Sequence, residues 1–390
     1  MPTTDDRDPL ITDRPRVHFT SRRGWINDPY GVTWRDGRYH LFFQHVPDHV
    51  EWRADQHWGH ATSPDLVRWG EEPVALAPGD GDGGLWSGCV IRPTDGDGRL
   101  FYSTVDVAAP SLSRVREARP RDADWRSWSK GAVVVVPPDD LDLVEFRDPF
   151  VLRDGDGWRM VVGGGTAEGV GLALTWTSAD LEAWTYDGVL ASRSGDEREP
   201  IWTGTVWECP QLFPLGDAWV LVVSVWSAGE THFVAAAVGD LQDGRFTPRT
   251  WQRLTHGSSH YAASAFVDAD GRQCLIHWLR DVVDPEAQWA GAHSVPHVLT
   301  LVGGRVVVAP HPAVADLVEP LAPGDSRRIG DADLALADGV LEVHRPAGAF
   351  AMPVDGPVGV LVDGPIVEVF AGSAVGGFTV QPRPGQGQQS

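Results

Sequence analysis

Five hairpin-like units that recur at a nearly constant interval constrain the fold of this chain most. Each unit contains an apolar run rich in Val, Phe, Tyr and Trp, then a turn, then a second apolar run, which is the pattern of two antiparallel β-strands. The turn glycines are separated by 61, 59, 59 and 55 residues, in the order Gly37, Gly98, Gly157, Gly216 and Gly271. A period of this length in a β-rich sequence indicates a repeat of similar sheets.

A second turn repeats behind each of the first four hairpins. Its aspartates recur at intervals of 59, 56 and 60 residues, in the order Asp65, Asp124, Asp180 and Asp240, and an aromatic residue follows each of them. One period therefore holds four strands, which form one blade of antiparallel sheet. Five such blades predict a β-propeller, an architecture that leaves few unprotected sheet edges. We expect the propeller to occupy residues 16–316.

A further strand-rich stretch follows the propeller at residues 317–382. Its apolar runs at 358–362 and 366–370 predict a β-sandwich-like module. The module is shorter than the roughly 100 residues of a typical sandwich. It therefore resembles a truncated sandwich, and we expect its strands to pack against the propeller instead of forming a core of their own. The polar segment 1–15 and the Gln- and Gly-rich tail 383–390 are predicted to be disordered.

Charge and composition narrow the classes of partner. The chain has 32 basic and 54 acidic residues, a net charge of -22, so nucleic acid and anionic membranes are unfavourable partners. It has no apolar run of about 18 residues and no apolar segment typical of a secretion signal near its start. We therefore expect a cytoplasmic protein with a small-molecule ligand. The three cysteines, Cys89, Cys209 and Cys274, are too far apart in sequence for a CxxC pair and indicate no disulfide framework.

Three acidic residues share one position in the repeat. Asp28 and Asp148 each lie nine residues before the turn glycine of their hairpin, and Glu208 lies eight residues before its own. The first strand of each blade lines the central channel of a propeller, so equivalent positions in different blades face one another. We expect these three carboxylates to converge.

Converging carboxylates beside tryptophan side chains are typical of glycoside chemistry. The chain contains 18 tryptophans, and an indole offers a flat apolar face to a sugar ring. One carboxyl group can protonate the leaving oxygen while another attacks the anomeric carbon or activates water. Metal binding by the three acids is the alternative. The Asp-Gly-Asp-Gly runs resemble calcium loops only faintly, because the other ligands of such a loop are missing, so we expect no metal and no cofactor.

Six motifs follow one another along the chain and together span most of the predicted propeller. They lie at residues 25–31 (WINDPYG), 43–47 (FQHVP), 58–63 (WGHATS), 86–88 (WSG), 147–149 (RDP) and 207–210 (WECP). In this order they resemble the motifs of glycoside hydrolase family 32, the invertases, levanases and inulinases.

The resemblance implies a retaining β-fructosidase that releases terminal β-D-fructofuranosyl units from sucrose or short fructo-oligosaccharides. Asp28 would be the nucleophile, Glu208 the general acid and base, and Asp148 the transition-state stabiliser. The side chains that would shape the fructosyl pocket are Asn27, Gln44, Trp52, Trp58, Trp86, Ser87, Arg147 and Trp278.

These roles require different protonation states. We expect Asn27 and nearby backbone donors to keep Asp28 ionised, and the apolar neighbours of Glu208 to help it hold its proton. Arg147 is expected to keep the adjacent Asp148 ionised.

Two positions depart from the motifs of the family. Tyr30 replaces the usual asparagine, which is expected to change the pocket wall beside Asp28. Ser259 and His260 stand where Asp-Phe is usual, so that a carboxylate is lost and an imidazole gained. We interpret His260 as a structural residue.

Several other functions share this pattern. A fructosyltransferase or a fructan hydrolase of the same family would use the same residues. An inverting arabinan- or xylan-type propeller glycosidase has a similar acidic trio, although the WINDP and ECP motifs argue against it. A catalytically silent sugar-binding propeller should have lost one of the acids, and none is lost.

Overall fold

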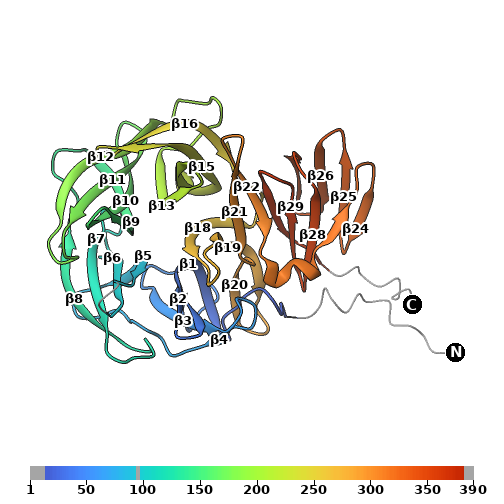
Figure 1. Cartoon of the computed structure of the whole chain (residues 1–390). Coiled ribbons are helices and arrows are strands. Elements are labelled where there is room, and N and C mark those ends of the chain that lie inside the picture. Colours follow the sequence, from blue (N-terminus) through green and yellow to red (C-terminus); the bar gives the residue numbers. More distant parts are fainter. Residues whose placement is uncertain (1–13, 94–96, 382–390) are drawn as a thin grey trace.

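The computed structural model describes residues 14–93 and 97–381. In this part of the chain, five blades of antiparallel sheet surround a common centre, and a two-sheet sandwich lies beside them (Figure 1). The predicted all-β fold class, a five-bladed propeller followed by a β-sandwich-like module, is confirmed. The expected tail 383–390, and residues 1–13 of the N-terminal segment, lie outside the described residues.

The strands of the blades follow chain order. Blade one contains β1 (Gly24–Arg35), β2 (Arg38–Val46), β3 (His57–Ser63) and β4 (Gly70–Glu71), and blade two contains β5 (Gly84–Ile91), β6 (Arg99–Val105), β7 (Arg114–Pro120) and β8 (Trp128–Val135). Blade three contains β9 (Leu143–Asp154), β10 (Gly157–Thr166), β11 (Val170–Ser178) and β12 (Thr185–Ser194). Blade four contains β13 (Val206–Leu215), β14 (Ala218–Ser227), β15 (Glu230–Gln242) and β16 (Arg245–Arg253). Blade five contains β18 (His260–Val267), β19 (Gln273–Asp284), β21 (His297–Val302) and β22 (Arg305–Pro310).

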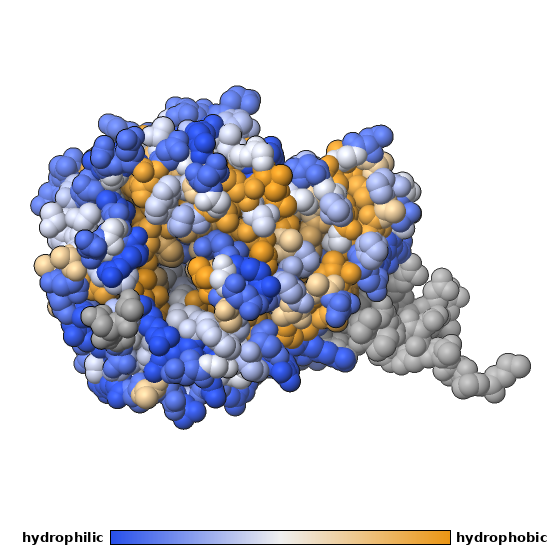
Figure 2. Space-filling model, viewed as in Figure 1, coloured by the Kyte–Doolittle hydropathy of each residue, from blue (hydrophilic) through white to orange (hydrophobic). Residues whose placement is uncertain are grey.

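The ring closes through one additional strand, β20 (Trp289–His293). This strand pairs antiparallel with β19 and parallel with β1, where Trp25 lies opposite Ala290. Blade five is therefore hydrogen-bonded to blade one, and both blades belong to one continuous sheet. Polar residues cover most of the outer surface of the blades in the view of Figure 2, in keeping with the net charge of -22.

The predicted hairpin turns join the first two strands of the blades. Gly37, Gly216 and Gly271 have positive φ angles of 80°, 63° and 82°, the conformation that tight hairpin turns require. In the third hairpin the glycine with positive φ is Gly155, at 57°, whereas Gly157 begins β10 opposite Asp154. The repeat therefore predicted this turn two residues too late.

The C-terminal module is a sandwich with a core of its own. A 3-10 helix, η1 (Pro312–Leu317), leads into it. One sheet contains β23 (Glu319–Leu321), β28 (Val358–Asp363), β29 (Ile366–Phe370) and β30 (Val375–Thr379), together with β17 (Thr255–Gly257). The other contains β24 (Ser326–Ile329), β25 (Ala332–Ala337), β26 (Val340–Arg345) and β27 (Gly348–Pro353).

The expectation that these strands lack their own core is wrong. Leu341, Met352 and Phe378 belong to a cluster of 16 buried side chains, all within the described part of the module. Seven members, among them Ile329, Leu334 and Leu341, come from β24–β27, whose residues were not counted as core. The sandwich also packs on the propeller, because Leu361 and Phe370 belong to the cluster that fills blades four and five. Residues 14–93 and 97–381 include no helix long and apolar enough to span a membrane.

Candidate active site

A proline lies one or two residues after each predicted acid and shapes the first strand of that blade. Asp28, Asp148 and Glu208 lie on β1, β9 and β13. Proline has no N–H to donate to a sheet, and the pairing of each strand is irregular at these points. Asp148 has a positive φ of 66°. Such bulges redirect side chains out of the sheet.

The three carboxylates line one pocket of about 470 Å³. They come from blades one, three and four, so the predicted convergence agrees with the geometry. Six of the expected pocket residues line the same cavity: Asn27, Gln44, Trp52, Trp86, Arg147 and Trp278. Two edge-to-face indole pairs form much of its wall, with ring centroids 5.9 Å apart for Trp52 and Trp86 and 5.6 Å apart for Trp25 and Trp278.

Asp28 is held by hydrogen-bond donors on both oxygens. The Ser87 hydroxyl donates to Oδ2 at 2.5 Å, and the Asn27 amide donates to Oδ1 at 2.9 Å. Gln44 donates to Ser87 Oγ at 2.6 Å, which orients that hydroxyl. Burial raises the pKa of Asp28 although the donated hydrogen bonds act in the opposite direction. The donors therefore fix the carboxylate in place without fully offsetting its desolvation.

Asp148 is the most buried of the three carboxylates, at 4% exposed. Its own N–H donates to Ser103 Oγ at 2.8 Å, and its Oδ2 accepts from the Cys209 N–H at 3.0 Å. Burial raises the pKa of Asp148 to about 7, against the opposing effect of Arg147. Arg147 lowers the pKa of Asp148, as expected, but desolvation outweighs this effect, so Arg147 does not suffice to keep Asp148 ionised.

The guanidinium of Arg147 instead bridges two other carboxylates. Its Nε and Nη2 each lie 3.0 Å from Glu208 Oε1, and its Nη1 pairs with Glu145. The Tyr261 hydroxyl donates to the second oxygen of Glu208. Two polar partners therefore contact Glu208, in addition to the apolar neighbours that the sequence predicted.

Two expected pocket residues lie behind the cavity instead of on its wall. Ser87 is 3% exposed and supports Asp28 from beneath. Trp58 is completely buried and packs against Tyr30, with ring centroids 4.1 Å apart and the ring planes tilted by 41°. Its indole N–H donates to the Trp86 carbonyl at 3.1 Å. Tyr30 is also buried in this core cluster, so its substitution changes the support of the pocket and not its wall.

The sequence reading missed several residues of this site: Trp25, Glu145, Cys209, Trp226 and Tyr261. Glu145 lies two residues before Arg147, and this spacing on a strand places both side chains on one face, so the pairing had a signal. The Cys209 thiol lies 3.5 Å from Asp28 Oδ2 and 3.6 Å from Asp148 Oδ2. No spacing rule connects this thiol to two distant carboxylates.

A protein-family model supports the sequence resemblance. The N-terminal domain of glycosyl hydrolases family 32 matches residues 18–310. The chain belongs to this family. Its match includes all five blades and the three pocket acids.

Relatives with known names are consistent with the family. The sucrose-6-phosphate hydrolase of Escherichia coli is 32% identical over 319 residues, which cover 76% of this chain and 64% of that protein. The raffinose invertase of Escherichia coli is 30% identical, covering 79% and 67%. The levanase of Bacillus subtilis is 31% identical, covering 76% and 46%. The chain thus spans about three fifths of the length of the sucrose-6-phosphate hydrolases, 64% and 61% for two of them.

A solved structure agrees with the fold over nearly the whole chain. The family 32 β-fructofuranosidase of Bombyx mori superposes with a TM-score of 0.80 at 25% identity, covering 94% of this chain and 89% of that one. A variant of that enzyme has been solved in complex with sucrose. The similarity therefore includes the sandwich as well as the propeller.

Proposed function

We propose that this chain is a retaining β-fructofuranosidase that releases terminal β-D-fructofuranosyl units from sucrose or short fructo-oligosaccharides. One observation carries the proposal: Asp28, Asp148 and Glu208, from three different blades, line a single pocket walled by tryptophans. Relatives named β-fructofuranosidase, raffinose invertase and levanase support the same reaction class.

The reaction takes two displacements at the anomeric carbon. Asp28 attacks this carbon, the glycosidic C–O bond breaks, and Glu208 gives its proton to the departing oxygen. The fructosyl group is then an ester of Asp28. Water attacks the same carbon, Glu208 takes a proton from it, and the ester bond breaks to restore the Asp28 carboxylate. Asp148 accepts hydrogen bonds from fructose hydroxyls during both steps.

Arg147 and Tyr261 are positioning residues for the acid. Both contact Glu208, and the Arg147 guanidinium also lies 5.7 Å from the Trp86 ring centroid and 5.9 Å from that of Trp226. An Arg between two indoles has little freedom to move. It therefore holds Glu208 Oε1 in place. The other oxygen, Oε2, accepts a hydrogen bond from Tyr261 and is free to give its proton to the glycosidic oxygen.

The charge of the pocket favours a neutral sugar. Four acidic side chains, Asp28, Glu145, Asp148 and Glu208, surround the single guanidinium of Arg147. A phosphorylated substrate would add negative charge to an already acidic cavity. We therefore expect sucrose to be a better substrate than sucrose 6-phosphate, although several relatives are named for hydrolysis of the latter.

Chromatography of the products from sucrose, sucrose 6-phosphate, 1-kestose and polymeric levan tests this function. The proposal expects fructose release from sucrose and 1-kestose, with lower kcat/KM for sucrose 6-phosphate and for levan. Transfer products at high sucrose concentration would favour the fructosyltransferase alternative. Absence of fructose release from all four compounds by folded protein would overturn the proposal.

A further inference from the structure

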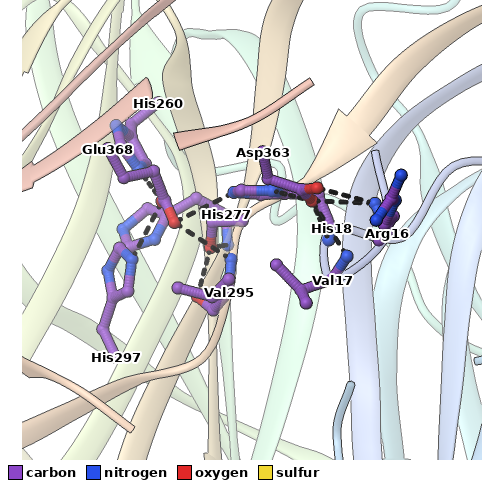
Figure 3. Close-up of polar contacts among 10 residues, drawn as sticks. Arg16, Val17, His18, His260, His277, Val295, His297, Asp363 and Glu368 are labelled. Atoms are coloured by element: carbon purple, nitrogen blue, oxygen red, sulfur yellow. Dashed lines mark hydrogen bonds and ion pairs between the residues drawn. The ribbon is translucent and has the colours of Figure 1, made fainter. Parts of the chain in front are cut away.

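Three buried histidines from neighbouring strands of blade five form a cluster beside the sandwich. His260 lies on β18, His277 on β19 and His297 on β21, and each is at most 2% exposed. One ring nitrogen from each lies within 4.8 Å of the others. Figure 3 shows the three rings grouped around Glu368. The cluster lies outside the pocket described above.

A carboxylate from the sandwich completes the cluster. Glu368, on β29, is fully buried, and its Oε1 lies 2.6 Å from His260 Nε2 and 3.1 Å from His297 Nε2. Its other oxygen, Oε2, lies 3.1 Å from His18 Nε2 and accepts from the Val295 N–H at 3.2 Å. The contacts to Oε2 orient the carboxylate so that Oε1 faces the histidines (Figure 3).

His277 has no polar partner in the described part of the chain. Neither of its ring nitrogens has a hydrogen bond there, although the side chain is 1% exposed. A buried polar atom without a partner destabilises the folded protein. An apolar side chain would avoid this cost, so His277 calls for a ligand that the protein chain itself does not provide, bound through one of its ring nitrogens.

We propose that His260, His277, His297 and Glu368 bind one divalent transition-metal ion of the zinc class. Three imidazole nitrogens and one carboxylate oxygen form a common four-coordinate donor set for zinc. Zinc–ligand bonds of about 2.0–2.1 Å place two ligand atoms of a tetrahedral site about 3.3 Å apart. Glu368 Oε1 lies 2.6 Å from His260 Nε2 and 3.1 Å from His297 Nε2. It therefore needs to move only slightly to bind the same ion as these nitrogens. The His18 and Val295 contacts to Oε2 are the outer partners that hold a ligating carboxylate in place.

We assign the site a structural role because its four ligand side chains are at most 2% exposed, so a substrate cannot reach them from solvent. It joins blade five to the sandwich through the side chain of Glu368. It also stiffens two strands of the pocket, since Tyr261 follows His260 and Trp278 follows His277, and successive side chains on a strand point to opposite faces. Tyr261 and Trp278 line the pocket and lie opposite each other in the sheet.

Metal analysis of tag-free, full-length protein tests the proposal. We expect about one equivalent of zinc per chain by elemental analysis. Removal with a chelator should lower Tm by several degrees, and Zn²⁺ or Co²⁺, but not Mg²⁺, should restore it. Bound Co²⁺ should give the intense visible absorption of a tetrahedral complex. Less than about one tenth of an equivalent after titration, with no shift in Tm, would overturn the site.

Variants separate a metal site from a buried hydrogen-bond network. His277→Leu should lose the metal and its chelator sensitivity, whereas the control His344→Ala, at an exposed position on β26, should keep both. Glu368→Gln should weaken the binding of Zn²⁺ at least about tenfold. A folded His277→Leu variant that binds Zn²⁺ as wild type would contradict the assignment. If a variant fails to fold, Co²⁺ titration of the wild-type chain still decides the question.

Discussion

Asp148 is the pocket carboxylate with the least exposure to solvent. It is 4% exposed and, although two hydrogen bonds fix it, burial raises its pKa from 3.8 to about 7. The folded protein therefore holds a proton that the unfolded chain releases above pH ~4. Ionised Asp148 destabilises the folded state increasingly as pH rises from about 4 to 7, and fully above pH 7.

Asp148→Asn should consequently be more stable than wild type at alkaline pH. At pH 8 we expect a Tm a few degrees higher, because the neutral amide removes the desolvated charge. Near pH 4 the difference should disappear, since Asp148 is then protonated in the folded protein. Thermal unfolding of both proteins at pH 4, 6 and 8 measures this, and a difference independent of pH would contradict the explanation.

Asp28 and Glu208 should act as a unit. Asp28→Asn and Glu208→Gln should each lower kcat by at least about three orders of magnitude, and the double variant should be little worse than either single one, because either loss blocks the same reaction. The control Asp217→Asn lies in the exposed turn of the blade-four hairpin and should leave kcat unchanged. Steady-state kinetics on sucrose measure these effects, and Tm shows whether each variant is folded. Near-normal turnover by a folded Asp28→Asn or Glu208→Gln variant would show that the assignment is wrong.

The residues of the site were only partly predictable. The common position of the three acids in the repeat predicted their convergence, because a repeated strand keeps its orientation in each blade. The partner of Arg147 was not predictable in the same way. Asp148 adjoins it in sequence, but neighbouring side chains on a strand point to opposite faces, and Glu208 on another blade lies closer to its guanidinium.

At the scale of elements, Asp363 anchors the N-terminal segment to the sandwich. It lies at the end of β28 and accepts the N–H groups of Arg16, Val17 and His18 at 2.8–3.0 Å. The His18 ring also lies 2.8 Å from it. This carboxylate therefore joins the segment that leads into blade one to a strand more than 300 residues later.

Asp363→Ala should be strongly destabilising. Removing one partner of a buried charged network costs about 3 kcal/mol or more, because the remaining groups stay buried without compensation. Asp333→Ala removes a carboxylate that is 57% exposed and pairs with Arg328 at 3.3 Å, so its effect should stay below about 1 kcal/mol. Urea unfolding compares the two variants. Equal effects would show that Asp363 is not an anchor.

The elements differed in how far the sequence predicted them. Hairpins were predictable because alternating apolar residues and turn glycines act locally. Strand β17 was not, because only three residues, Thr255–Gly257, join the sandwich sheet by pairing with residues more than 100 positions later. The core of the sandwich was missed because seven of its side chains come from β24–β27, whose short strands alternate buried and exposed residues instead of forming apolar runs.

At the scale of the whole molecule, the ring brings distant strands into one pocket. The 55- to 61-residue period predicted the five blades, whereas the closing contact between β20 and β1 joins strands about 265 residues apart and has no local signal. Only the closed ring places Asp28, Asp148 and Glu208 around one cavity. In the proposed reaction, Asp28 then acts as a nucleophile toward the anomeric carbon.

Rapid NMR of the first sugar released from sucrose tests whether Asp28 is the nucleophile. Two displacements restore the original configuration at the anomeric carbon, and they require carboxyl groups about 5–5.5 Å apart. We predict that β-fructofuranose is the first product, before mutarotation mixes the forms. Initial release of α-fructofuranose would mean a single displacement by water, and would contradict the role of Asp28 as nucleophile.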